Sequence, residues 1–169
     1  MKHKPKLLII IVLAGILLYS SCKKPETYSP IPAIAYVSFA KIQNSQGIDQ
    51  KGILTFSFTD GDGDIGLSAD DTTGAFSPGS QYYYDLFVTY YEKQNGVYVP
   101  VVLPETNNLR IPVVTPSGQN KSIKGTIDVN LFINNPTSVY DTIAYDVAIC
   151  DRALHMSNKI RTPDIIVHK

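Results

Sequence analysis

The chain has 169 residues, with 15 basic and 15 acidic side chains and a formal net charge of zero at pH 7. This length suits one domain after a leader, and the absence of any basic patch gives no support for nucleic-acid binding. With only two cysteines, Cys22 and Cys150, the exported domain is expected to depend on its hydrophobic core rather than on disulfides.

The N-terminal 21 residues have the order typical of an export signal. Three lysines among the first six residues give a basic start, residues 7–18 form an apolar run, and two serines then precede Cys22. The apolar run is shorter than the roughly 20 residues that a membrane-spanning helix needs. We therefore predict that residues 1–21 are a signal peptide that is removed from the mature chain.

The stretch LLYSSCKK around Cys22 resembles the lipobox of bacterial lipoproteins, in which cleavage exposes a cysteine that is then lipidated. Tyr19 replaces the leucine that usually lies three positions before the cysteine, and Leu18 lies one position earlier. The resemblance implies palmitate-type acylation of Cys22 and a lipid anchor in the cell envelope, with the outer membrane as the expected location. The multiple acyl chains of such lipoproteins suffice for stable anchoring. The alternative is a plain secretory signal in which Cys22 is incidental.

Beyond the cysteine, the chain predicts a short tether and one all-β domain. Residues 22–31 are polar and carry two prolines, as a tether does, while residues 32–169 alternate apolar and polar side chains between turn residues. The pair Asn95-Gly96 is a strong hairpin signal. Seven or eight strands at this spacing predict an antiparallel, immunoglobulin-like β-sandwich. The expected strands are 33–42, 52–59, 81–93, 98–103, 110–114, 122–133, 142–150 and 162–168.

Three aspartates follow the second expected strand at alternate positions in TDGDGDIG: Asp60, Asp62 and Asp64. Two like charges about 4 Å apart repel by roughly 1 kcal/mol in water and roughly 4 kcal/mol at an effective dielectric of 20. Residues 52–92 contain no lysine or arginine, so converging carboxylates there need solvent or a cation. The spacing is typical of calcium loops, although Ile65 and the flanking strands exclude an EF-hand. The alternative is an ordinary Asp/Gly turn.

Strand parity connects this loop with a second one. The core-facing alternation of residues 54–58 ends on Asp60, and that of residues 145–149 ends on Asp151. In an immunoglobulin-like sandwich the two following loops lie at the same end, where Asn158 could add an amide oxygen. The candidate calcium ligands are therefore Asp60, Asp62, Asp64, Asp151 and Asn158.

Together, FSFTDGDGDIG and YDVAICDRALHMSNKIRTPDI resemble stretches in Bacteroidota lipoproteins of mostly unassigned function that carry one immunoglobulin-like domain. In those proteins the second stretch often reads D-x-A-G-N-x-S-N. Asp151, Ala153, Ser157 and Asn158 match that pattern, whereas residues 154–156 replace its Gly-Asn centre. The resemblance supports the architecture and implies no particular activity.

The tyrosine-rich stretch QYYYDLFVTYYEK is the other unusual feature. If Leu86 and Val88 face the core, then Tyr83, Phe87 and Tyr91 point outward. Such a row could stack on sugar rings or contact a partner protein. The alternative is that tyrosines favour strands and pair across them.

Catalytic motifs are sparse. The chain contains neither G-x-S-x-G nor H-E-x-x-H, and Ser157, His155 and Asp151 are neighbours in sequence without that implying a triad. We therefore predict a non-enzymatic envelope lipoprotein that acts as a binding or structural module, with calcium as the candidate cofactor. Its partners would be the membrane, through the anchor, and an envelope protein or glycan. The alternative is a glycan-binding accessory protein of a polysaccharide-uptake system.

Overall fold

The structure is a computed structural model that describes residues 26–169. The expected signal peptide, the predicted lipidation site at Cys22 and the first residues of the expected tether lie outside the described residues. Within the described range, no helix has the length and apolar character needed to cross a membrane.

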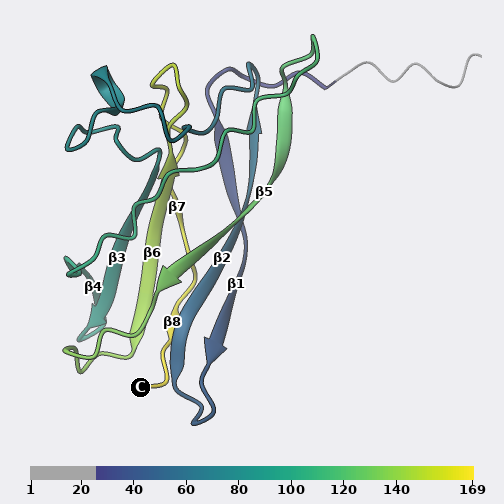
Figure 1. Cartoon of the computed structure of the whole chain (residues 1–169). Helices are drawn as coiled ribbons and strands as arrows, with labels where there is room; N and C mark the ends of the chain where they lie inside the picture. The colour runs from purple at the N-terminus through teal and green to yellow at the C-terminus, as the bar shows by residue number, and fades with distance from the viewer. Residues whose placement is uncertain (1–25) are drawn as a thin grey trace, which may run out of the picture.

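Two antiparallel sheets make up the fold, and helix is limited to the single 3-10 turn η1 (Gly74–Phe76) in the described chain (Figure 1). The three-stranded sheet has the order β1 (Ala33–Gln43), β2 (Asp49–Asp60), β5 (Ile123–Phe132). The second sheet has the order β4 (Val97–Pro100), β3 (Leu86–Gln94), β6 (Thr142–Ile149), β7 (Ile160–Arg161), and β8 (Ile165–Ile166) also pairs with β6. The all-β prediction is confirmed, and the arrangement is consistent with a β-sandwich.

Strand β2 supplies the clearest link between sequence pattern and core. Leu54, Phe56 and Phe58 are buried at alternate positions, and the residues between them are only partly covered. Alternation with period two places these three side chains on the face that meets the other sheet. The same phase continues to Asp60, which is fully buried at the end of the strand.

Strand β6 is central in its sheet, since it pairs with β3 along one edge and with β7 and β8 along the other, and its residues are buried on both faces. On its inner face, the Tyr145 ring stacks with Phe39 at 5.9 Å and meets Tyr90 edge-on at 5.6 Å, which joins the two sheets. On its outer face, Asp146 forms two hydrogen bonds with Arg161.

Some strand boundaries differ from the prediction. The hairpin at Asn95-Gly96 is confirmed, with φ of 51° and 85°. Residues 81–85 form a turn, so β3 begins only at Leu86. Residues 110–114 do not form a strand, because the chain there is held by the buried carboxylate of Asp85, which accepts the N–H of residue 111 at 2.7 Å. Of the last expected strand, 162–168, only Ile165–Ile166 forms a strand, β8, and β7 lies just before it at Ile160–Arg161.

The loop after β2, the loop after β6 and the first described residues of the tether lie at one end of the molecule, and the C-terminus lies at the other (Figure 1). We call the first the aspartate end and the second the opposite end. The hairpin between β3 and β4 is at the opposite end.

Candidate metal centre

Four carboxylates converge at the aspartate end. Asp60 ends β2, Asp62 and Asp64 lie in the loop that follows, and Asp151 comes directly after β6. Each offers an oxygen, and these oxygens all lie within 4.8 Å of one another. A bridge between Ile65 and Asp151 holds the two loops together. Four of the five sequence-predicted ligands are thus brought to one place; we call them the aspartate cluster.

Glycine lets the first loop approach its neighbours closely. Gly63 has a φ of 65°, and a Cβ added there would collide with the carbonyl oxygen of Lys121. Gly66 has a φ of 101° and lies equally close to the carbonyl oxygen of Pro112. Only glycine adopts such φ values without strain. The Asp-Gly repeat therefore allows a tight loop that carries its carboxylates towards β6.

The hydrogen bonds of the aspartate cluster leave two buried oxygens unused. Asp60 Oδ2 accepts the N–H of Asp64 at 3.0 Å, and Asp64 Oδ2 accepts the N–H of Ala153 at 3.1 Å. Asp151 accepts the N–H of His155 at 2.7 Å, and its second oxygen lies 2.9 Å from His155 Nδ1. Asp60 Oδ1 and Asp64 Oδ1 are buried and have no hydrogen-bond partner among residues 26–169. Unpaired buried carboxylate oxygens are costly, so each calls for an explanation.

Burial and mutual repulsion disfavour the ionised form of these carboxyls. Burial is the main reason that the pKa of Asp60 is raised to about 6; the N–H of Asp64 partly offsets it, while the charges of Asp62 and Asp151 add to it. Burial, followed by the charge of Asp151, raises the pKa of Asp64 as well. A cation at the cluster would reverse both effects, because positive charge favours the ionised form.

The nearest arginine already has a partner. Arg152 forms a two-pronged pair with Asp71, with N–O distances of 2.6 and 2.9 Å, and this guanidinium holds the pKa of Asp71 far below its usual range. The pair closes the loop that follows the aspartate cluster. Asp71 is thereby assigned to an ion pair rather than to the cluster.

The fifth predicted ligand, Asn158, has a different role. Its Oδ1 accepts the N–H of Ile34 at 2.8 Å, and its Nδ2 donates to the carbonyl of the same residue at 2.8 Å. The amide thus mimics a strand partner for the start of β1 and ties the loop after β6 to the other sheet. Strand parity could not reveal this, because the contact depends on how the two sheets pack.

His155 also lies at this site, although no motif in the sequence predicted a role for it there. It lies against Asp151, four residues earlier, and its side chain is partly exposed. A catalytic triad does not follow, because the hydroxyl of Ser157 is engaged with the backbone: it accepts the N–H of Ile149 at 3.0 Å and donates to the carbonyl of Asn158 at 2.8 Å.

The predicted aromatic row is interrupted. Tyr83 precedes β3 and lies under the guanidinium of Arg110, at 5.1 Å from the ring centroid. Tyr91 is covered by Arg161, whose guanidinium is 4.4 Å from the ring. Phe87 lies between them on β3, and all three rings are half-buried. Glycan binding stays a prediction, without the open aromatic platform that the sequence led us to expect.

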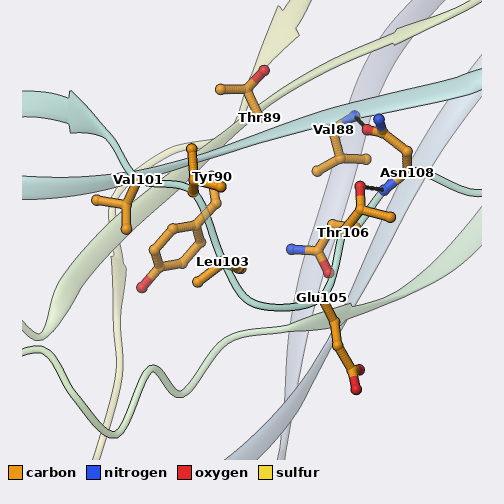
Figure 2. Close-up of a pocket in the computed structure, with 10 residues that line it drawn as sticks. Val88, Thr89, Tyr90, Val101, Leu103, Glu105, Thr106 and Asn108 are labelled. Atoms are coloured by element: carbon orange, nitrogen blue, oxygen red, sulfur yellow. Dashed lines mark hydrogen bonds between the residues drawn. The ribbon is translucent and has the colours of Figure 1, made fainter. Parts of the chain in front are cut away.

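A cavity of about 210 Å³ lies beside the edge of β3 (Figure 2). Tyr90 and Leu103 line one side of it, and Thr106 and Asn108 line another. The polar groups here serve the backbone, since Asn108 Oδ1 accepts the N–H of Val88 at 2.8 Å and Thr106 Oγ1 accepts the N–H of Asn108 at 3.0 Å. The carboxylate of Glu105 points away from the other side chains (Figure 2). The cavity therefore lacks converging charged groups.

Cys150 is buried next to the aspartate cluster, and burial raises the pKa of its thiol to about 12. The thiol thus stays protonated at neutral pH and is a poor nucleophile and a poor metal ligand. This fits the expected role of a small core residue.

Comparison with known proteins adds no family assignment: no family model matches the chain, and no curated protein matches it.

Proposed function

We propose that the protein is a lipid-anchored module of the bacterial cell envelope, and that its immunoglobulin-like β-sandwich binds Ca²⁺ at the aspartate cluster. The observation that supports this proposal is the convergence of four carboxylates within 4.8 Å, two of which keep a buried oxygen without a partner. A bound cation would satisfy both oxygens and remove the repulsion among the charges.

The ligand chemistry favours calcium over other common cations, because the four residues of the cluster offer only carboxylate oxygens. Ca²⁺ binds oxygen ligands at about 2.3–2.6 Å, so ligands on opposite sides of the ion are about 4.6–5.2 Å apart. The cluster's oxygens all lie within 4.8 Å of one another, which allows them to surround an ion of this size. Mg²⁺ usually keeps several waters and is bound through only one or two carboxylates, fewer than the four gathered here. Zn²⁺ usually takes nitrogen or sulfur ligands, whereas His155 Nδ1 lies against Asp151 and the thiol of Cys150 is protonated.

The role proposed for the ion is structural rather than catalytic. It would join the end of β2, the loop after β2 and the start of the loop after β6 at a single point. These segments carry little regular secondary structure, so their order depends on such links. A rim fixed in this way would present one defined surface to an envelope partner.

The proposal is tested by calorimetric titration of the full chain in detergent with CaCl₂, together with thermal unfolding in calcium and in EGTA. We expect heat of binding and a higher Tm in calcium, with stabilisation of about 2.7 kcal/mol when free calcium is 100 times Kd. Asp64→Asn should abolish both. Asp70→Asn, which changes an exposed carboxylate of the same loop outside the cluster, should preserve both. Absence of heat and of any Tm rise at millimolar calcium would refute the proposal.

A further inference from the structure

The tether lies directly against the loop that carries the aspartate cluster. The N–H of Tyr28 donates to Ser122 Oγ at 3.4 Å, and the same hydroxyl donates to the carbonyl of Gly61 at 3.1 Å. Gly61 separates Asp60 from Asp62, and a Cβ added to it would collide with the carbonyl oxygen of Tyr28. The chain therefore reaches the domain at the aspartate end and not at the opposite end (Figure 1).

The length of chain before the tether limits how far this end can be from the anchor. Cys22 precedes Glu26, the first described residue, by four positions. Four residues span at most about 14 Å when fully extended, whereas the 12 residues of β2 span about 40 Å. A lipid on Cys22 would thus keep the aspartate end much closer to the membrane than the opposite end.

The aspartate end also exposes apolar side chains around its charged centre. Val113 and Val114 are exposed beside the first loop, where the N–H of Val114 donates to the carbonyl of Ile65. Leu154 and Met156 are exposed in the loop after β6, and Leu154 has a φ of 69°. Exposed apolar residues also occur elsewhere on the described surface. At this end, however, they lie on or beside the two loops that carry the cluster, an arrangement that suits insertion at the level of lipid headgroups.

The charge of the aspartate cluster determines whether this end can contact a membrane. Lipid phosphates are anionic, so carboxylates without a cation are repelled once they come within a Debye length, about 8 Å at physiological salt. A bound Ca²⁺ takes six to eight oxygen ligands, more than four single carboxylate oxygens supply. Asp62 is the exposed member of the cluster, so the ion would be open to an external oxygen on that side.

We propose that calcium seats the aspartate end on the membrane surface, with a lipid phosphate oxygen as an external ligand of the ion next to Asp62. This inference rests on the proposed function, because it needs both the anchor at Cys22 and the ion at the aspartate cluster. The independent observation that supports a ligand there is Asp60 Oδ1, which is buried and has no hydrogen-bond partner among residues 26–169. Without calcium, the domain would stand away from the membrane on its tether.

The test measures how close each end lies to lipid. The lipidated full chain, carrying Cys150→Ala and either Met156→Cys or Val97→Cys, is labelled with a fluorophore and reconstituted into vesicles of phosphatidylglycerol and phosphatidylethanolamine with a headgroup nitroxide lipid. Met156 is exposed at the aspartate end, and Val97 is exposed at the opposite end. We expect strong loss of fluorescence at position 156 in calcium, recovery in EGTA, and little change at position 97. Asp62→Asn should prevent the loss at position 156, and Asp70→Asn should not.

Two kinds of failure are distinguishable. Equal quenching at both positions, stronger quenching at position 97, or quenching at position 156 that ignores EGTA would overturn the inference, provided that calorimetry on the same sample shows bound calcium. Absence of calcium heat would overturn the proposed function, and the inference with it. If the protein washes off the vesicles as readily as a Cys22→Ala variant, the lipid anchor is absent. That result would also overturn both the proposed function and the inference.

Discussion

The two ends of the sandwich bury carboxylates equally well but neutralise them differently. At the opposite end, Asp49 is fully buried, and its Oδ2 receives the ammonium of Lys41 at 2.6 Å and the N–H of His168 at 2.8 Å. At the aspartate end, Asp60 is also fully buried but receives only one backbone N–H, from Asp64. The two sites differ in partners, not in burial.

The pKa values of these two carboxyls shift in opposite directions as a result. Burial alone would raise the pKa of Asp49, but Lys41 and the N–H of His168 outweigh it and hold that pKa below its usual value. For Asp60 the burial effect wins, and its pKa is raised to about 6. This contrast between one neutralised carboxylate and several grouped together is a further reason for our proposal that the second set serves a ligand.

Glu92, also towards the opposite end, is a buried carboxylate that is hydrogen-bonded to neutral groups rather than paired with a cation. It is buried and accepts hydrogen bonds from Asn135 Nδ2 at 3.0 Å and from Ser138 Oγ at 2.8 Å. Neutral donors can therefore satisfy a buried carboxylate in this fold. Among residues 26–169, Asp49 Oδ1 at the opposite end and Asp60 Oδ1 and Asp64 Oδ1 at the aspartate end are left without such a donor, so the ends differ in the neutralising cation and in the number of carboxylates grouped together.

Removing the ammonium group of Lys41 at the opposite end should cause the largest loss of stability. Lys41→Ala leaves the charge of Asp49 buried without its partner, and breaking such a pair costs about 3 kcal/mol. Urea denaturation of the full chain in EGTA measures this loss. Lys51→Ala, which truncates an exposed lysine on β2, is the matched control and should change stability by less than about 0.5 kcal/mol. Equal effects of the two variants would contradict the assignment of Lys41 as the neutralising group.

The sequence could predict Asp60 and Asp151 as neighbours, because side-chain parity along β2 and β6 is a local property that ends on each aspartate. It could predict the hairpin at Asn95-Gly96 for the same reason, since both φ values are set locally. It could not predict the pair of Lys41 with Asp49, which depends on the register of β1 against β2 and on a register shift near Gln43.

The other errors concern packing between elements. Residues 110–114 have the composition of a strand, but the side chain of Asp85 takes the N–H of Ile111 that a neighbouring strand would use. Tyr83 falls outside β3 and Tyr91 lies beneath Arg161. Strand parity alone therefore predicted both rings to be more exposed than they are. Side chains that compete for backbone groups or cover rings cannot be found from alternation.

The calcium-free protein should lose stability as pH rises from about 4 to about 6. The folded pKa of Asp60 lies above its unfolded value, so the folded state holds an extra proton in this window and stability falls as that proton is lost. We expect a decrease of at most about 2 kcal/mol, after allowance for solvent screening at the rim. Urea denaturation at a series of pH values in EGTA measures it.

Two comparisons isolate the contribution of Asp60. Saturating calcium should remove much of the decrease, because the ion favours the ionised carboxylates. Asp60→Asn keeps an oxygen for the N–H of Asp64 and should reduce the decrease in EGTA. A residual decrease is expected from Asp85, whose pKa burial also raises to about 6. A pH profile in EGTA that rises between 4 and 6 would contradict the assigned direction.

The smallest expected loss of stability is that of Asn158→Ala, which tests whether Asn158 is a structural amide or a metal ligand. Asn158→Ala removes two hydrogen bonds to Ile34, each worth about 0.5–1.5 kcal/mol; because both are only partly buried, we expect the lower end of their sum, a loss of about 1 kcal/mol in urea denaturation. Calorimetry should give a calcium Kd close to that of the unmodified chain, because Asn158 Oδ1 serves the start of β1 and not the cluster. A tenfold weaker Kd, about 1.4 kcal/mol of binding energy, would instead return Asn158 to the ligand set. In that case its oxygen, which has a second lone pair, would link the ion to the start of β1 as well as to the two loops.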